Sequence, residues 1–439
     1  MRGRRRVAVA AAAVALAAAI AISVVPSWTA SPTSLPPGST APSTVPGATV
    51  YKGASPTNEG ATPTTLMPAP SALFADPGGT VYEMDRLSVE SGWVFEYVQG
   101  LPPQIMFTDD AGATWRDATP PGLTETPTID FLDPRHGWVL EMGAFDQTTS
   151  AAIPASLWRT SDGGRHWTLA TLPRQDISAA TISFIVPTAG YLAVTPNAEP
   201  NSRQTILYAT ADGGSSWTKV GVVADEQLDS EWSHQLFFLS KSDGFFVNDG
   251  SVSETHDDGR TWKPVSFARP AEIPASAYVN VLDFVVAGSD VLASAEYGWK
   301  TGDSLAFASG YEFISHDRGE TWSIAWSGVP GLDSRSKVVA VDETTLLRFR
   351  DYRGSIPDTY TTAFTVTHDG GLTWTSVSAA LPSDTHFYAE SFANALDGWA
   401  VVAVNVYCPD GALCPGPSPG GRLVETSDGG VTWRLGSTR

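Results

Sequence analysis

The octapeptide TSDGGRHW, from Thr160 to Trp167, recurs with variations six more times along the chain. The shared pattern is Ser or Thr, any residue, Asp, any residue, Gly, two further residues and Trp. The other copies are TDDAGATW (108–115), TADGGSSW (210–217), THDDGRTW (255–262), SHDRGETW (315–322), THDGGLTW (367–374) and TSDGGVTW (426–433). Successive copies begin between 45 and 60 residues apart. This spacing is typical of one four-stranded blade, so the repeat predicts an all-β, seven-bladed β-propeller.

The residue types of the octapeptide suit a tight turn between two strands. The Asp carboxylate can accept hydrogen bonds from backbone N–H groups of its own turn, and the Gly can adopt a positive φ without strain. The Trp offers a large apolar surface for burial against neighbouring sheet. The residues assigned this structural Asp-box role are Asp110, Gly112, Trp115, Asp162, Gly164, Trp167, Asp212, Gly214, Trp217, Asp257, Gly259, Trp262, Asp317, Gly319, Trp322, Asp369, Gly371, Trp374, Asp428, Gly430 and Trp433.

The box carboxylates could also be considered as calcium ligands or catalytic acids. A hard cation needs several oxygen ligands in one place, whereas one carboxylate per turn on seven blades does not converge. Four of the histidines lie inside boxes and are interpreted as turn residues: His166, His256, His316 and His368. No catalytic, metal-binding or cofactor-binding residue is therefore assigned.

A second repeat precedes most boxes. It consists of an apolar strand, a short polar turn and a Gly followed by an aromatic residue, as in IDFLDPRHGWVLEM and SFANALDGWAVVAV. Blades five and six carry looser versions, LDFVVAGSDVLASAEY and VVAVDETTLLRF. Each blade is thus expected to run from an inner strand through a Gly-aromatic strand to a third strand that ends in the box. A single blade cannot bury both faces, so seven of them must close on themselves.

These repeats resemble a known family. The seven boxes are similar to the BNR or Asp-box repeats of bacterial sialidases, sortilin-type receptors and xyloglucanases. Together with the Gly-Trp strand they resemble the photosystem II assembly and stability factors. The resemblance covers Val81 to Leu435 and implies a propeller; it says little about function, since one fold hosts many functions.

The N-terminus is typical of an exported protein. Arg2 to Arg6 form a basic segment, and Val7 to Val25 is an apolar run, with one Ser, that is long enough to span a bilayer as a helix. We therefore expect residues 1–25 to be a signal peptide or a membrane anchor, with the following chain outside the cytoplasm. Residues 26–71 are rich in Pro, Ser and Thr and are expected to be a disordered linker, which leaves 72–439 for the propeller.

Cys408 and Cys414 are the only cysteines of the chain. In an exported protein, a pair this close is most simply a disulfide that closes a small loop. Two thiolates do not complete a zinc site, so the metal alternative is weaker.

An enzyme with this repeat would need further residues. Sialidases, which the repeat resembles, use an Arg triad, a Tyr nucleophile assisted by Glu, and an acidic Asp; this sequence offers no clear first Arg of the triad. The best Arg cluster is Arg348, Arg350 and Arg353 in LLRFRDYRG, a candidate patch for binding an anion or a protein, or else a solvated strand edge. Glu296 and Tyr297 are adjacent, so on a strand they would face opposite ways.

A formal net charge of −20 makes nucleic-acid binding a poor match, because that binding depends on Lys and Arg. We therefore expect a secreted or membrane-anchored, non-catalytic propeller that binds an envelope or extracellular protein, or a glycan, and that contacts the membrane through its N-terminal segment if this is not cleaved. A sialidase-like glycoside hydrolase is the alternative.

Overall fold

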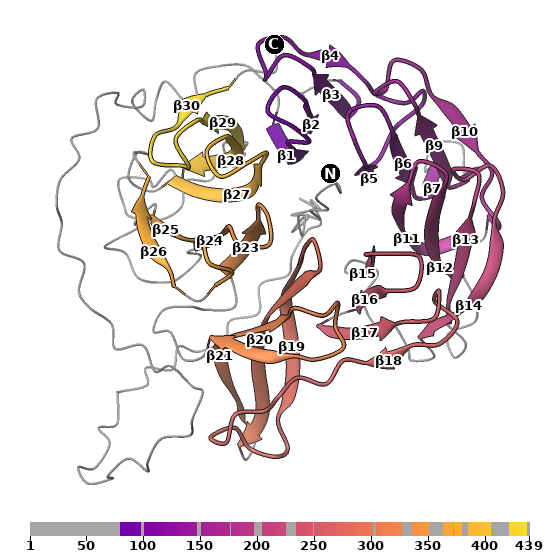
Figure 1. Ribbon diagram of the computed structural model, residues 1–439. Coiled ribbons are helices and arrows are strands. Elements are labelled where there is room, and N and C mark those ends of the chain that lie inside the picture. Colours follow the sequence, from indigo (N-terminus) through magenta and orange to yellow (C-terminus); the bar gives the residue numbers. More distant parts are fainter. Residues whose placement is uncertain are drawn as a thin grey trace, which may run out of the picture. The chain divides into compact units, whose positions relative to one another are not determined.

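The computed structural model describes residues 80–97, 101–146, 151–175, 177–196, 204–224, 234–248, 250–301, 304–326, 336–350, 363–371, 373–379, 385–404 and 421–436. Within these ranges the main sheets are seven, each of four antiparallel strands, and they are labelled in Figure 1. Each sheet is one blade, so the predicted all-β, seven-bladed propeller is confirmed. In the described part of the chain, no helix is long and apolar enough to cross a membrane.

The strand bounds follow the repeat. Blade 1 contains β1 (Thr80–Asp85), β2 (Gly92–Tyr97), β3 (Gln104–Thr108) and β4 (Arg116–Asp117). Blade 2 contains β5 (Thr128–Phe131), β6 (Gly137–Glu141), β9 (Ser156–Thr160) and β10 (Thr168–Ala170), and a separate hairpin of β7 (Ala144–Asp146) and β8 (Ala151–Ile153) is inserted after β6. Blade 3 contains β11 (Ile177–Val186), β12 (Ala189–Pro196), β13 (Thr205–Thr210) and β14 (Thr218–Ala224).

The remaining blades have the same order. Blade 4 contains β15 (His234–Phe238), β16 (Gly244–Asn248), β17 (Ser251–Thr255) and β18 (Lys263–Pro264). Blade 5 contains β19 (Tyr278–Ala287), β20 (Asp290–Thr301), β21 (Ser304–Ser315) and β22 (Ser323–Trp326). Blade 6 contains β23 (Ser336–Ala340), β24 (Leu346–Arg350), β25 (Ala363–Thr367) and β26 (Thr375–Ser378), and blade 7 contains β27 (Thr385–Phe392), β28 (Gly398–Val404), β29 (Arg422–Thr426) and β30 (Arg434–Leu435).

Several expectations fall outside the described residues. These are the signal or anchor segment 1–25 with its apolar helix, the linker 26–71, the cysteine pair Cys408 and Cys414, and Arg353. The described part of the propeller begins at Thr80.

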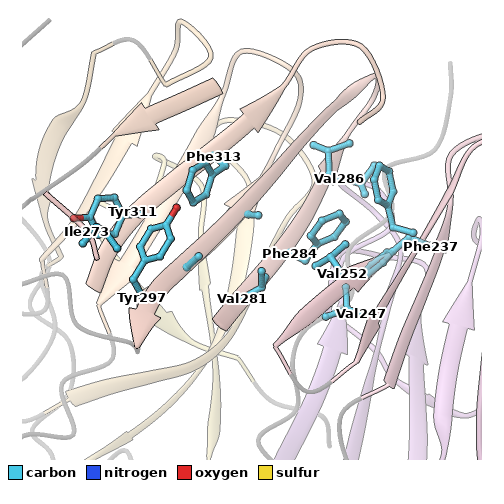
Figure 2. Close-up of a cluster of buried hydrophobic side chains, with 14 residues drawn as sticks. Phe237, Val247, Val252, Ile273, Val281, Phe284, Val286, Tyr297, Tyr311 and Phe313 are labelled. Atoms are coloured by element: carbon cyan, nitrogen blue, oxygen red, sulfur yellow. The ribbon is translucent and has the colours of Figure 1, made fainter. Parts of the chain in front are cut away.

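The hydrophobic core is divided into seven clusters, one at each junction between neighbouring blades. The cluster between blades 4 and 5, for example, contains Phe245 and Phe284, and it is drawn in Figure 2. The cluster that joins blade 7 to blade 1 contains Trp399 and Val94 and closes the propeller. Each blade therefore buries both faces against its neighbours, as the repeat required.

The Gly-aromatic repeat is explained by ring packing at these junctions. A Cβ on Gly190 would lie 2.4 Å from the ring of Phe184 on the inner strand of the same blade. The other face of Phe184 stacks on Trp138 of blade 2, with ring centroids 3.5 Å apart. Phe238 is held in the same way between Gly244 and Tyr191 of blade 3. The glycine is needed because any side chain there would displace the ring.

Blade 1 uses a variant of this packing. Arg86 stands where blades 2, 3, 4 and 7 carry the aromatic ring, and its guanidinium lies 5.0 Å from the ring of Trp399 of blade 7. A Cβ on Gly92 would meet the same indole at 2.4 Å. Arg86 also donates to the backbone oxygen of Gly398 at 3.2 Å. The junction that closes the propeller thus adds a cation–π contact and a hydrogen bond to its apolar cluster.

Polar side chains join neighbouring inner strands at four junctions. Each accepts a hydrogen bond from a backbone N–H of the following blade, at 2.8 to 3.0 Å. The pairs are Asp130 with Phe184, Ser183 with Phe238, Asp283 with Val338, and Ser391 with Arg86. Each bond satisfies a backbone donor of the next inner strand that would otherwise need water.

The Asp box is a closed network of hydrogen bonds, as the box at 210–217 shows. The carboxylate of Asp212 accepts bonds from the backbone N–H of Ser216 at 2.9 Å and from the hydroxyls of Thr210 and Ser216. The Thr210 hydroxyl in turn accepts a bond from the N–H of Gly214, which has φ of 90°. The seventh residue of the box, Thr, Ser or His in all copies, thus completes the turn, a role that the repeat pattern alone does not reveal.

The fourth box position also adopts a left-handed conformation in every blade. It is Gly in four boxes, but Ala111, Asp258 and Arg318 take φ between 61° and 65° there. In six blades the N–H at this position donates to a carbonyl of the turn between strands one and two, as Gly163 does to Arg135 at 2.8 Å. The box is therefore anchored to its own blade from outside the octapeptide.

The box tryptophans pack against the preceding blade, and the fourth strand begins at the residue after each of them. Trp433 is 3% exposed and its indole N–H donates to the oxygen of Gly430. Trp322 is only partly buried and contacts Phe267, with ring centroids 5.0 Å apart. The seven indoles therefore contribute unequally to stability.

Replacing Trp433 by Ala should lower the free energy of unfolding by about 3 to 5 kcal/mol, because it empties a buried site. Replacing Trp322 should cost less, about 2 kcal/mol, since less apolar area leaves water when it folds. Urea unfolding of both variants beside the parent measures the difference. Equal losses would contradict the unequal burial of the two indoles.

The box carboxylates should contribute to acid stability. Hydrogen bonds from Ser216 and Thr210 lower the pKa of Asp212 to about 2, whereas an unfolded Asp titrates near pH ~4. A lowered folded pKa adds stability above the unfolded value, and this stability is lost as pH falls through the folded value. The difference in melting temperature between the parent and Asp212→Asn should therefore shrink between pH ~4 and pH ~2. A difference in melting temperature that stays constant over this pH range would contradict the contribution of the Asp212 carboxylate.

Candidate functional site

The strands alternate in direction, so each blade has two ends. The box end holds the turn between strands one and two and the Asp box between strands three and four. The loop end holds the connections between strands two and three and those between successive blades. Turns between strands one and two have two to six residues, whereas connections between strands two and three range from two residues after β16 to seventeen after β28. Variable connections on a regular scaffold are where binding residues usually lie, so the loop end is the more promising of the two.

At the box end, most box carboxylates and histidines of the described residues already have hydrogen-bond partners. The box carboxylates are occupied by their own turns, and three box histidines contact carboxylates: His166 with Asp162, His256 with Asp243 and His316 with Asp290. No group of three or more His, Cys, Asp or Glu residues in the described ranges is arranged to hold a metal ion.

At the loop end, blade 5 is extended by long strands. Tyr297 and Tyr311 lie in the extension and pack edge to face, and Figure 2 shows them beside Phe313. The Tyr297 hydroxyl donates to the oxygen of Ala268 at 3.0 Å, and burial raises its pKa to about 12. Glu296 is instead bonded to Asn280 across the strand pair. Tyr297 is therefore not placed or tuned as a nucleophile beside Glu296.

Blade 1 carries a second aromatic group at the loop end, which we call the Tyr82 cluster: Tyr82, Tyr97, Glu125, Thr126 and Glu141. Tyr82 is the extra residue of a β-bulge between Val81 and Glu83 on the inner strand, and its side chain is 45% exposed. Its ring meets that of Tyr97 edge to face, with centroids 5.1 Å apart. Bulges commonly re-aim a side chain at functional sites.

The remainder of the Tyr82 cluster is held rigidly. The buried carboxylate of Glu141 accepts bonds from the N–H and hydroxyl of Thr124 and from the N–H of Glu125, at 2.7 to 2.9 Å. These bonds fix the connection between blades 1 and 2, and the Thr126 hydroxyl then lies 2.8 Å from that of Tyr97. Burial raises the pKa of Tyr97, and the negative charges of Glu125 and Glu141 raise it further. Such a tyrosine is a poor nucleophile and remains protonated.

The repeat pattern did not predict this cluster, although one signal for it is present in the sequence. Tyr82 lies in VYEMD and Tyr388 in FYAES, at matching positions before the turns of blades 1 and 7. A bulge between Phe387 and Ala389 places Tyr388 at the same register position on β27. Periodicity cannot reveal these positions, because a bulge interrupts the alternation of faces.

The arginine patch predicted from the sequence requires correction. Arg348 is 2% exposed, forms an ion pair with Glu312 of blade 5 and lies over the ring of Trp374, 4.2 Å from its centroid. It belongs to the junction between blades 5 and 6, so it is neither a surface anion site nor a solvated strand edge. Arg350 is the last residue of the same strand, and its side chain lies outside what the structure describes.

Other described arginines also join blades. Arg116 donates to the backbone oxygen of Gly163 in blade 2, and Arg159 donates to that of Asp212 in blade 3 at 2.9 Å. With Arg86 and Arg348 they make four guanidinium groups that are used between blades. These four do not converge as a clamp for a substrate carboxylate.

The comparisons agree with this architecture. A family model described as BNR/Asp-box repeat matches residues 313–323, which include the fifth box. The match covers one box, and the structure places an octapeptide of the same pattern on each of its seven blades. No curated protein matches the sequence.

Solved structures show similar propellers. The GH74 xyloglucanase from Xanthomonas campestris is 14% identical, with a TM-score of 0.53 over 82% of this chain and 55% of the enzyme, so this chain spans little more than half of that protein. YCF48 bound to D1 peptide is 17% identical, with a TM-score of 0.43 over 71% of this chain and 80% of YCF48. YCF48 from Cyanidioschyzon merolae is 14% identical, with a TM-score of 0.44 over 83% of this chain and 98% of that protein. At these identities the likeness to the xyloglucanase shows the fold alone.

Breaking the buried ion pair should be costly. Arg348→Ala or Glu312→Ala alone should lower the free energy of unfolding by about 3 to 5 kcal/mol, because each leaves a buried charge unpaired. Replacing both together, by Met and Leu, should recover most of that loss. Arg165→Ala, which breaks an exposed 2.8 Å pair with Asp109, is the matched control and should cost less than about 1 kcal/mol. Equal losses for Arg348→Ala and Arg165→Ala in urea unfolding would contradict the buried role.

Proposed function

We propose that this chain is a non-catalytic, extracytoplasmic β-propeller that binds a protein partner through its loop end. The observation that carries the proposal is the contrast between the two ends. The box end is regular and its box carboxylates are occupied, whereas the loop end has connections of unequal length and an aromatic pair, the exposed Tyr82 and the half-buried Tyr97. Exposed aromatic residues on a rigid frame are typical of protein interfaces.

The extracytoplasmic location is supported by the sequence. The basic and apolar segments of residues 1–25, the Pro-rich linker and the close pair Cys408 and Cys414 fit a secreted or membrane-tethered protein. A linker of this composition would let the propeller reach partners at a distance from the membrane.

A sialidase-like hydrolase is the alternative, and the described residues support it less well. An enzyme must hold its nucleophile, base and substrate clamp in one place. Tyr97 does lie near Glu125 and Glu141, but its pKa is raised instead of lowered. Arg86, Arg116, Arg159 and Arg348 are occupied between blades.

The proposal is tested by photo-crosslinking in the producing cells. A photoreactive residue replaces Leu101 at the loop end, which is 48% exposed, or Val431 at the box end, which is 43% exposed. The full-length chain should form a discrete protein adduct from position 101 and none from position 431. Equal adducts at both positions, or none at position 101, would refute a loop-end partner.

A second measurement addresses catalysis directly. The full-length protein is incubated with a fluorogenic sialoside, and no turnover above the rate without protein is expected. Turnover that Tyr97→Phe abolishes would establish the hydrolase in place of the binding module.

A further inference from the structure

We propose that the Tyr82 cluster is the site that receives a basic segment of the protein partner, with a lysine or arginine side chain seated against the Tyr82 ring. This inference rests on the proposed function, since it names the chemistry of the partner at the loop end. It goes further in assigning a particular site and a particular charge to the interaction.

The first argument is the geometry of the aromatic pair. Tyr82 and Tyr97 meet at an interplanar angle of 86°, and Tyr97 packs in turn against Phe95 at 5.3 Å. Tyr97 is thus held by the blade, and it supports the exposed ring of Tyr82 from one side. A ring fixed in this way offers an exposed π surface to a ligand with little loss of side-chain entropy on binding.

The second argument is the sign of the surrounding charge. Glu125 is exposed on the connection that Glu141 fixes, and it directly precedes Thr126, whose hydroxyl lies 2.8 Å from that of Tyr97. A cation over an aromatic face is attracted by the ring quadrupole, and nearby carboxylates add to that attraction.

Charge also decides between partners of different chemistry. An anionic ligand, such as a sialoside or a phosphate, would be repelled by the same carboxylates. A neutral sugar could stack on Tyr82 and donate hydroxyl hydrogen bonds to Glu125, but it carries no positive charge for the carboxylates to attract. The whole chain, at −20, would steer a basic segment toward it over distances of about a Debye length, ~10 Å at about 0.1 M salt.

Blade 5 offers a matched control within the same molecule. Tyr278 is 50% exposed at the loop end, and its ring lies against the backbone of Gly298, where a Cβ would be 2.4 Å away. Glu272 is an exposed carboxylate on the connection that leads into blade 5, and it forms a hydrogen bond with Tyr311. Tyr278 and Glu272 match the exposure and charge of Tyr82 and Glu125, but neither belongs to the Tyr82 cluster.

The test measures binding of a fluorescent peptide that carries two lysines to the full-length protein in mild detergent, by fluorescence anisotropy. The same peptide with both lysine side chains acetylated is the uncharged comparison. The lysine peptide should bind, its affinity should fall as salt is raised, and the acetylated peptide should bind at least about five-fold more weakly.

The variants then locate the site. Tyr82→Ala should weaken binding of the lysine peptide about five-fold, Tyr82→Phe should retain it because the ring face remains, and Glu125→Gln should weaken it measurably. Tyr278→Ala and Glu272→Gln should leave the affinity unchanged. Melting temperatures close to the parent exclude loss of fold as the cause.

Contrary results separate this inference from the proposed function. Equal losses from the blade 5 variants, or equal binding of the acetylated peptide, would overturn the site. So would tighter binding of a neutral oligosaccharide that Tyr82→Ala abolishes. A loop-end protein adduct whose yield does not change in Tyr82→Ala would refute the inference and leave the proposed function standing. Peptide binding at Tyr82 with no protein adduct from position 101 would refute the loop-end protein partner and leave Tyr82 only as a site for a cationic side chain.

Discussion

The structure depends on rings packed between neighbouring blades. At the repeated junctions, a ring on one inner strand lies between a glycine of its own blade and an aromatic residue of the blade before it, as Phe184 does between Gly190 and Trp138. No blade has a core of its own, because its apolar side chains are buried only when the next blade is present. Folding of one blade is therefore coupled to its neighbours, and the contact of Trp399 with Arg86 and Gly92 completes the series.

The two blades that lack the full Gly-aromatic pattern show what else can hold a junction. Val291 and Leu346 stand where other blades have the glycine, so no ring can lie over the backbone there. Between these blades, Arg348 pairs with Glu312 and lies over Trp374, while Asp283 accepts the N–H of Val338. Burial raises the pKa of Glu312, and the nearby guanidinium opposes that rise. Where the Gly-aromatic pattern is missing from the sequence, in blades 5 and 6, a buried ion pair joins the two blades instead of a stacked ring.

The parts of the fold that repeat could be predicted, and those that occur once could not. Asp, Gly and Trp recur because every blade has the same tight turn between its third and fourth strands. The number of boxes therefore predicted the number of blades. The pairing of Arg348 with Glu312 joins residues on different blades, and nothing local to LLRFRDYRG distinguishes a buried guanidinium from an exposed one. Tyr82 was missed for a related reason: its exposure depends on a bulge, which shifts register without leaving a periodic pattern.

This division between repeated and unique features also separates stability from recognition. The box end carries the repeated network, and changes there would strain turns whose fourth and fifth residues have positive φ. The loop end is free of that constraint, because its connections only need to join strands that the junctions already hold. Glu141 shows how a unique feature can still be rigid: one buried carboxylate fixes residues 124 and 125 and so positions Thr126 beside Tyr97. A recognition site can therefore arise on one blade without altering the arrangement that closes all seven.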